Sequence, residues 1–114
     1  METGHQKRKN RPITTGVLDY FPLALLELAR LSKIANDQHH PGQPLHWSRS
    51  KSIDHADCLV RHLLDRGTID HDGVTHTAKV AWRALALLQE ELEEEKALEL
   101  GVSKEEVASR GSKY

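Results

Sequence analysis

Apolar residues recur every three or four positions in three long stretches of the chain, which is the spacing of one face of a helix. The pattern predicts a first helix over about 19–36. It predicts a second helix from a serine near 50 to residue 65 or 66, and a third from 75 or 77 to about 100. The run Ser103-Lys-Glu-Glu resembles a helix cap and predicts a short terminal helix.

The predicted helix ends rest on capping residues. Asp19 is the candidate N-cap of the first helix, and Ser50 or Ser52 is the candidate for the second. Gly67 and Gly101 are expected to end the second and third helices, because glycine adopts the left-handed conformation at little steric cost.

Two connections complete the prediction. Residues 36–47 contain two prolines and a glycine, which indicates a long loop. Residues 68–74 contain an Asp-Gly pair, which indicates a tight turn or a short hairpin. No run alternates with period two for long enough to form a sheet. The expected fold is therefore all-α, a small bundle of three main helices with a short C-terminal helix.

A chain of 114 residues is expected to form one domain with one core. The predicted organisation is a flexible basic arm over 1–15, a helical domain over 16–101, and a short helix and tail over 102–114. A domain this small exposes much of its surface, so a homo-oligomer is expected.

Charge and apolar content restrict the class of partner. The formal net charge is -1, which makes nucleic acid an unlikely ligand; the basic run at 6–11 and the acidic run at 90–95 are expected to be solvated. No stretch approaches the ~20 apolar residues of a membrane span, and no signal-peptide core is recognisable. A cytoplasmic protein is expected.

The single cysteine, Cys58, excludes an intrachain disulfide and is predicted to lie in the core.

Two acids occupy positions where the helical pattern predicts a core residue. Glu27 belongs to the otherwise apolar row 20, 24, 27, 31 and 34, and Asp57 belongs to the row 53, 57, 60 and 64. Asp54 lies one turn before Asp57 on the same side. Carboxylates grouped from two helices can hold Mg²⁺ or Mn²⁺, which prefer oxygen ligands. The alternative is structural ion pairing of Asp57 with Arg61, and of Glu27 with Arg30 or Lys33; spacing does not decide between the two.

Several side chains are candidates for binding a triphosphate. Positive groups near a metal would neutralise charge that develops on phosphate oxygens, and His62 and His76 are predicted as phosphate contacts or orienting groups. Trp47 is the predicted base-stacking residue, whereas Trp82 is expected in the core. The candidate cations are Lys33, Arg61, Lys79 and Arg83.

The eight histidines raise the question of zinc. Their spacing includes no His-Glu-x-x-His motif, and the chain has no cysteine pair. The sequence therefore disfavours zinc.

Four segments, covering roughly residues 15–92, resemble the dATP/dGTP diphosphohydrolase N-terminal family, which is common in bacteriophages and related to the MazG-like all-α nucleotide pyrophosphohydrolases. They are Gly16-Val-Leu-Asp-Tyr-Phe-Pro-Leu-Ala-Leu-Leu-Glu-Leu-Ala-Arg, Pro44-Leu-His-Trp, Asp54-His-Ala-Asp-Cys-Leu-Val-Arg-His-Leu-Leu and Gly73-Val-Thr-His-Thr-Ala-Lys-Val-Ala-Trp-Arg-Ala-Leu-Ala-Leu-Leu. The resemblance implies Mg²⁺-dependent hydrolysis of nucleoside triphosphates, purine dNTPs above all, to the monophosphate and pyrophosphate.

The resemblance also implies a ligand set. MazG-like enzymes hold metal with an acidic pair on each of two helices; Glu27 matches one acid of the first pair, and Asp54-x-x-Asp57 resembles the second. Ala24 and Arg30 stand where a partner of Glu27 would be, so the first pair is incomplete. The resemblance implies that Glu27 and Asp57 are catalytic. It also implies a location in the host cytoplasm if the chain is phage-encoded. The alternative is a non-catalytic helical assembly protein of phage origin; a DNA-associated regulator is the least favoured reading.

Overall fold

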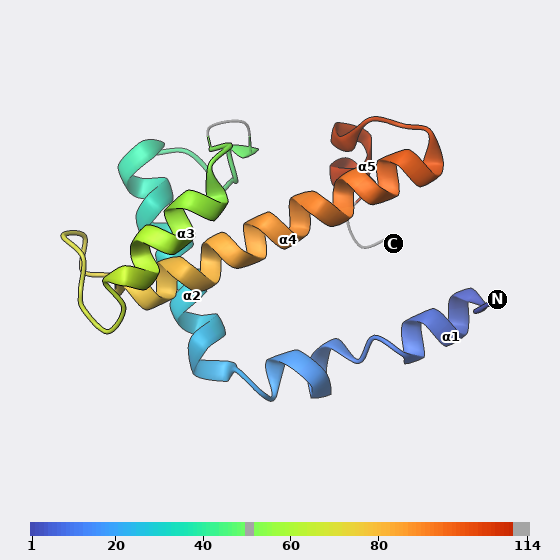
Figure 1. Cartoon of the computed structure of the whole chain (residues 1–114), viewed down its shortest axis with the longest axis horizontal. Coiled ribbons are helices and arrows are strands. Elements are labelled where there is room, and N and C mark those ends of the chain that lie inside the picture. The colour runs from blue at the N-terminus through green and yellow to red at the C-terminus, as the bar shows by residue number, and fades with distance from the viewer. Residues whose placement is uncertain (50–51, 111–114) are drawn as a thin grey trace. The chain divides into compact units, whose positions relative to one another are not determined.

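The computed structural model describes residues 1–49 and 52–110, and this part of the chain is helical, with no strand assigned in it (Figure 1). The predicted all-α class is thereby confirmed. The helices are α1 (Gly4–Lys9), α2 (Pro22–His39), α3 (His55–Leu64), α4 (His76–Leu100) and α5 (Lys104–Arg110), with a π-helical turn η1 (Thr14–Leu18) before α2. The chain divides into two compact units, Met1–His46 and Trp47–Tyr114, and the predicted domain at 16–101 includes parts of both.

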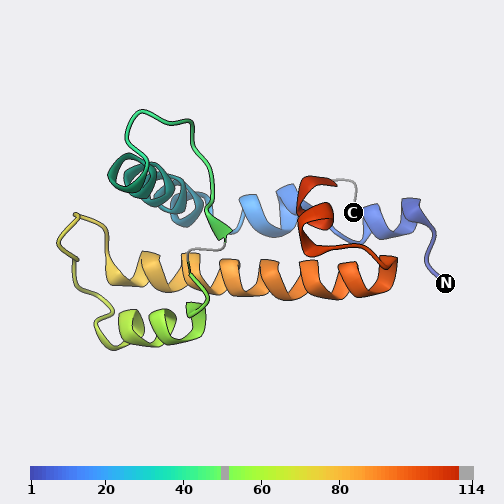
Figure 2. The same ribbon diagram turned by 90° about the horizontal axis from the view of Figure 1, so that it is seen from above.

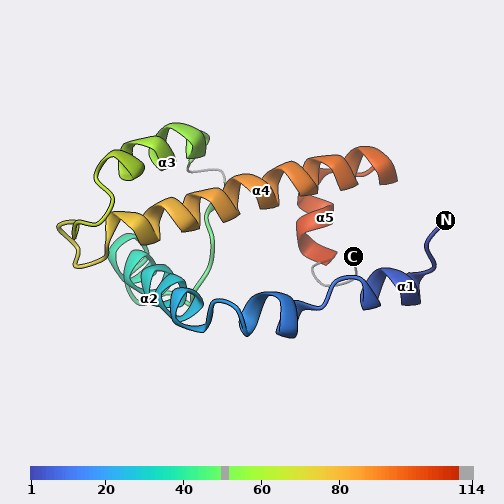
Figure 3. The same cartoon turned by 60° about the horizontal axis from the view of Figure 1, so that its bottom comes forward.

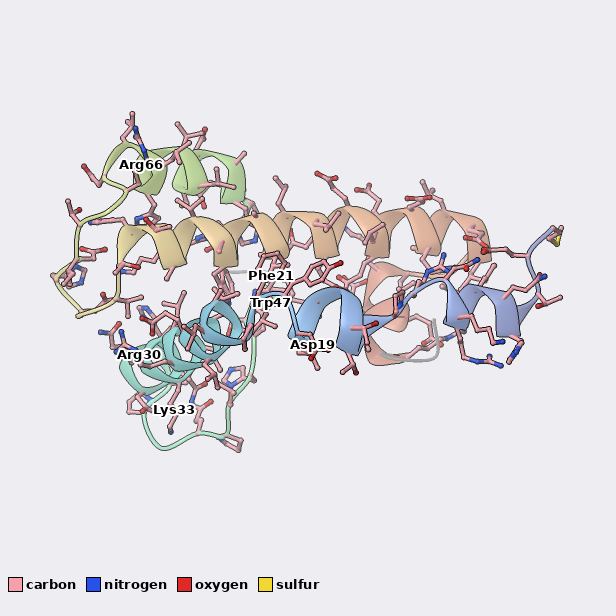
Figure 4. The ribbon with its side chains drawn as sticks, turned by 90° about the horizontal axis from the view of Figure 1, so that it is seen from below. Asp19, Phe21, Arg30, Lys33, Trp47 and Arg66 are labelled. Atoms are coloured by element: carbon pink, nitrogen blue, oxygen red, sulfur yellow. The ribbon has the colours of Figure 1, made fainter. Side chains whose placement is uncertain are left out.

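Helix α2 begins and ends three residues later than predicted. Pro22 is its first residue, where the fixed φ angle and the missing N–H of proline are tolerated. Asp19 is not the N-cap; it lies on the segment before α2 (Figure 4), and the cap position is Phe21. At the other end, Asn36 continues the helix because its buried side chain holds the following loop. Its amide Nδ2 donates to the Gln43 carbonyl over 2.9 Å.

The first fifteen residues were expected to form a flexible arm, and the structure places helix α1 there. The Thr3 hydroxyl accepts a hydrogen bond from the Gln6 N–H over 3.1 Å, and the Gln6 side chain accepts one from the Thr3 N–H over 2.8 Å. This reciprocal cap satisfies two backbone donors at the helix start. Every residue of α1 is exposed, so the helix depends on local bonds within this segment.

In the second unit, α3 lies beside the first half of α4, and α5 turns back beside the end of α4 (Figures 2 and 3). The predicted bounds of α4 are confirmed: the Thr75 hydroxyl accepts from the Ala78 N–H over 3.1 Å, and Gly101 ends the helix with a φ of 69°. Ser103 caps α5 through the Glu106 N–H, also as predicted.

Helix α3 is shorter than predicted. It begins at His55, after Asp54, whose side chain makes no capping hydrogen bond. Ser52 precedes the helix without being its cap, and the other candidate, Ser50, lies outside the described residues. The helix ends at Leu64, close to the predicted position.

The connection between α3 and α4 is a closed turn with a single antiparallel bridge between Ile69 and Thr75. The Asp70 N–H donates to the Val74 carbonyl over 2.9 Å, and the Gly73 N–H donates to the Asp70 carbonyl over 3.0 Å. Gly73 has a φ of 82°, as expected for the predicted Asp-Gly turn. Val74 is fully buried and anchors the turn to the unit.

The buried apolar side chains of the second unit are small; they are Cys58, Val74, Ala86, Ala97 and Val107. Cys58 is therefore in the core, as predicted, while Trp82 is half-buried. None of the described helices has both the length and the apolar character that crossing a membrane requires.

One acid of the run at 90–95 contradicts the expectation of a solvated face. Glu93 is buried, and its carboxylate oxygens both accept from Arg49 Nη1 over 2.6 Å. Gln89 Nε2 donates to the same carboxylate over 3.0 Å. The buried charge is tolerated because it is both paired and hydrogen-bonded.

Candidate functional site

A group of ionisable side chains in contact with one another surrounds the turn between α3 and α4. We call this group the turn cluster; its members are His62, Asp70, Asp72, His76 and Lys79. His62 comes from the last part of α3, the two aspartates come from the turn, and His76 and Lys79 come from the first part of α4. The hydrogen-bonded turn therefore brings together groups up to 17 positions apart in the chain.

The two imidazoles of the turn cluster contact each other. His62 Nδ1 and His76 Nδ1 are 2.8 Å apart, so one of these nitrogens donates its hydrogen to the other. Burial lowers the pKa of His62, and the nearby His76 and Lys79 lower it further. A lowered pKa means that the His62 ring is neutral at pH 7.

Lys79 joins the two aspartates. Its Nζ donates to Asp70 Oδ2 and to Asp72 Oδ2, each over 2.7 Å, and all three side chains are at least four-fifths buried. The hydrogen bond from Lys79 lowers the pKa of Asp70 strongly, with help from the His71 N–H. Burial raises the pKa of Asp72, but the bond from Lys79, the bond from the Val74 N–H and the charge of Lys79 together lower it by more. Burial lowers the pKa of Lys79, and its two carboxylate partners more than reverse this.

The charge balance of the turn cluster decides what it can bind. Two carboxylates and one ammonium sum to a net negative charge, and the His62 ring, whose pKa is lowered, adds no positive charge. Such a group repels a phosphate and attracts a cation. The predicted phosphate contacts His62, His76 and Lys79 do lie together, but Lys79 would have to leave two aspartates to meet a triphosphate.

The predicted inward position of Asp57 is wrong. Asp57 and Asp54 are exposed, and the row that includes Asp57 faces solvent: Ile53 is 96% exposed and Leu64 is 75% exposed. The helix instead packs the row formed by His55, Cys58, Leu59 and His62. Both rows have helical spacing. The second row packs against α4 because its two histidines form hydrogen bonds with side chains of α4: His62 with His76, and His55 with Arg83.

The predicted pairing of Asp57 with Arg61 also differs from the structure. Arg61 Nη2 donates to Cys58 Sγ over 2.8 Å and lies 4.0 Å from Asp54 Oδ2. Within the described residues, Asp57 has no ion pair or hydrogen bond from its side chain. Asp54, Asp57 and Arg61 are all exposed, and Arg61 lies beside Asp54; we call these three residues the α3 acidic site.

Glu27 lies in the first unit, on α2, with its side chain 35% exposed. Arg30 donates to both of its carboxylate oxygens, with the Nη2 bond at 3.3 Å, and this hydrogen bonding lowers the pKa of Glu27. The structural ion pair that the spacing allowed is therefore present. Lys33, a predicted phosphate contact, pairs with Asp37 over 2.9 Å; Arg30 and Lys33 both project from α2 in Figure 4.

The ring of Trp47, the predicted base-stacking residue, already contacts two other side chains, Trp82 and Arg49. Its ring is half-buried and meets Trp82 edge to face, with centroids 5.7 Å apart. The Arg49 guanidinium lies over the Trp47 ring at 4.0 Å. Stacking on a nucleobase from that side would require Arg49 to move, and the predicted role of Trp47 stays a prediction.

Arg83 was predicted from the sequence as a candidate phosphate contact, but its bond to His55 was not predicted, and Asp70, Asp72, Arg49 and Glu93 were not identified as bonded groups. Arg83 Nη1 donates to His55 Nδ1 over 3.0 Å, and His55 is 3% exposed. Asp70 and Asp72 flank the predicted turn, and an Asp-x-Asp-Gly run shortly before a helix that carries a lysine in its first turn was the available signal. Arg49 and Glu93 are far apart in the chain, so no local pattern pointed to their pairing.

No protein-family model, curated protein or solved structure matches the chain.

Proposed function

We propose that this chain is a divalent-cation-dependent nucleoside triphosphate diphosphohydrolase that acts on purine deoxynucleotides and releases pyrophosphate. The single observation that carries the proposal is the α3 acidic site. Asp54 precedes α3 as its N-cap and Asp57 lies in its first turn; both are exposed, and Arg61 follows one turn after Asp57. An open carboxylate pair suits Mg²⁺ or Mn²⁺, which keep several waters and bind through one or two carboxylates plus substrate phosphates.

The resemblance to the dATP/dGTP diphosphohydrolase N-terminal family supports the same residues. Asp54-x-x-Asp57 resembles the second acidic pair of MazG-like enzymes, and Glu27 resembles one acid of the first. The predicted cytoplasmic location is part of this proposal.

In this mechanism, Asp54 and Asp57 would hold the cation. A cation bound there would supply charge neutralisation at the phosphate oxygens and would activate the attacking water. Arg61 is placed to neutralise charge on the same phosphates, because its guanidinium lies beside Asp54. Water adds its oxygen to the α-phosphorus, the bond to the bridging oxygen breaks, and pyrophosphate leaves. An unligated carboxylate oxygen accepts the proton of the water.

Incubation of the purified full chain with each dNTP and MgCl₂, followed by anion-exchange separation of the products, tests the proposal. We expect dNMP and pyrophosphate in equal amounts, faster with dATP and dGTP than with the pyrimidines, and no product in EDTA. Release of dNDP and phosphate, or no cleavage of any dNTP with Mg²⁺ or Mn²⁺, contradicts it.

A second candidate, a non-catalytic helical assembly protein, is favoured by a row of leucines on α4. Leu85, Leu88 and Leu92 follow a three-then-four spacing, and each is 51% exposed. Such a row is the pattern by which two helices pair along a seam. Light scattering after size exclusion should give a mass above 12.9 kDa for the wild type, and Leu88→Glu should return the chain toward that value. A monomeric wild type removes the support for assembly.

A further inference from the structure

The turn cluster contains a ligand set that the proposed hydrolysis does not use. One atom from each of His62, Asp70 and His76 can be chosen so that all three lie within 4.8 Å of one another. Two imidazole nitrogens and one carboxylate oxygen are the protein ligands of many open zinc and non-haem iron sites. We propose that His62, Asp70 and His76 bind one divalent transition-metal ion of the zinc class.

The distances suit such an ion after small side-chain rotations. Two donor atoms that are each about 2.1 Å from a tetrahedral metal lie about 3.4 Å apart. His62 Nδ1 and His76 Nδ1 are 2.8 Å apart, and His76 Nδ1 and Asp70 Oδ2 are 3.9 Å apart. The two separations fall on either side of the tetrahedral value, so each changes by about half an ångström when a metal binds. Both imidazoles then direct a lone pair at the metal from Nδ1 and carry their hydrogen on Nε2.

The backbone and neighbouring groups already orient the three ligands. Asp70 Oδ1 accepts from the His71 N–H over 2.7 Å, and its Oδ2 faces the rest of the turn cluster. The His76 N–H donates to the Thr68 carbonyl over 3.0 Å, which fixes the start of α4 against the turn. Hydrogen bonds from outside the ligand shell are how metal sites hold carboxylates and imidazoles in place.

The chemistry of the donors selects the metal. Neutral imidazole suits Zn²⁺, Fe²⁺, Co²⁺ and Ni²⁺, whereas Mg²⁺ prefers oxygen ligands and is expected at the α3 acidic site instead. Lys79 keeps its bond to Asp72 over 2.7 Å when Asp70 turns to the metal, so the charge of Asp72 stays compensated. The metal would join the end of α3 to the start of α4 across the turn. This site is independent of the proposed hydrolysis.

Zinc binding to the purified full chain tests the inference. After treatment with EDTA and dialysis, Zn²⁺ is titrated in competition with a chromogenic chelator, with millimolar Mg²⁺ present throughout. We expect one tightly bound Zn²⁺ per chain, binding at least 100-fold weaker in His62→Gln and His76→Gln, and unchanged binding in the control His39→Gln, which alters an exposed histidine on α2.

Two further readouts keep the test independent of the fold of the variants. Circular dichroism reports whether the glutamine variants retain their helices. Co²⁺ added to the wild type should give visible absorption bands of an imidazole-containing site, and Zn²⁺ should displace them. No Zn²⁺ binding by the wild type, or equal binding by folded His62→Gln and His76→Gln, overturns the inference, whatever the result of the dNTP assay.

Discussion

Replacing Asp57 by asparagine should lower Mg²⁺-dependent pyrophosphate release more than about 100-fold, because even groups that only support a metal ligand contribute 10- to 100-fold to activity. The side chain is exposed and makes no hydrogen bond or ion pair within the described residues, so its loss removes charge without opening the packed face of α3. The expected cost in unfolding free energy is below about 1 kcal/mol, the contribution of an acid near a helix N-terminus. Initial rates of pyrophosphate release measure the first effect, and urea unfolding measures the second.

Asp65→Asn is the matched control for this prediction. Asp65 is also exposed and lies at the other end of α3, as its C-cap, so the same change of charge occurs on the same helix. We expect this variant to hydrolyse dNTPs at the wild-type rate. Equal rates for wild type and Asp57→Asn would remove Asp57 from the mechanism, and equal losses in both variants would point to net charge instead of a ligand.

Replacing Lys79 by methionine should destabilise the second unit by about 3 kcal/mol, since removing one partner of a buried ion pair leaves uncompensated charge. The lysine side chain is 14% exposed, and its partners Asp70 and Asp72 are 19% and 8% exposed. Methionine retains the apolar length of the side chain, so the loss reports the ammonium group. Urea unfolding at pH 7, followed by circular dichroism, measures the difference.

The pH dependence of Lys79→Met follows from the lowered pKa values of the two aspartates. A carboxyl group whose folded pKa is lowered stabilises the fold above its usual pKa, here 3.8, and loses that contribution as the pH falls through the folded value. The wild type should therefore lose stability below about pH 4, by linkage. In Lys79→Met that loss should shrink or reverse, because protonation then relieves the repulsion between two unpaired carboxylates.

Lys33→Met provides the comparison for an exposed pair. Lys33 bonds Asp37 over 2.9 Å, with side chains 68% and 55% exposed. Solvent-exposed ion pairs contribute about 0–1 kcal/mol, so this variant should unfold near the wild-type urea midpoint. A Lys79→Met variant that is as stable as Lys33→Met at pH 7 would show that the turn cluster is effectively solvated.

The sequence predicted the helices where local chemistry decides. Thr75 and Gly101 bound α4 because a hydroxyl cap and a left-handed glycine act on adjacent backbone groups. The C-terminal end of α2 was shifted because Asn36 bonds a loop carbonyl seven residues later, a contact that no helix-propensity pattern contains. Local rules thus fixed the class and the order of the helices, and contacts along the chain adjusted their ends.

The face of α3 could not be predicted from periodicity alone. The row with Ile53 and Asp57 is more apolar in sequence, yet the helix buries His55 and Cys58. Burial of His55 costs less free energy because Arg83, 28 positions later, donates a hydrogen bond to its ring. A polar residue with such a partner is compatible with burial, and the partner cannot be read from the helix itself.

In the candidate sites, too, local spacing was predictable from the sequence, whereas contacts between helices were not. The Asp54-x-x-Asp57 spacing predicted that both acids share one side of α3, whereas their exposure required the packing against α4. The histidines of the turn cluster matched no zinc spacing, because the turn and not a short motif brings His62 and His76 within 2.8 Å.

Manganese binding measured by electron paramagnetic resonance tests the central claim, that the acids of α3 hold the hydrolytic cation. With Zn²⁺ present to fill the histidine ligands, free Mn²⁺ is counted as the full chain is titrated. We predict that wild type and Asp65→Asn bind Mn²⁺, that Mg²⁺ competes for it, and that the double substitution of Asp54 and Asp57 by asparagine abolishes binding. Undiminished Mn²⁺ binding by that folded double variant would contradict the account.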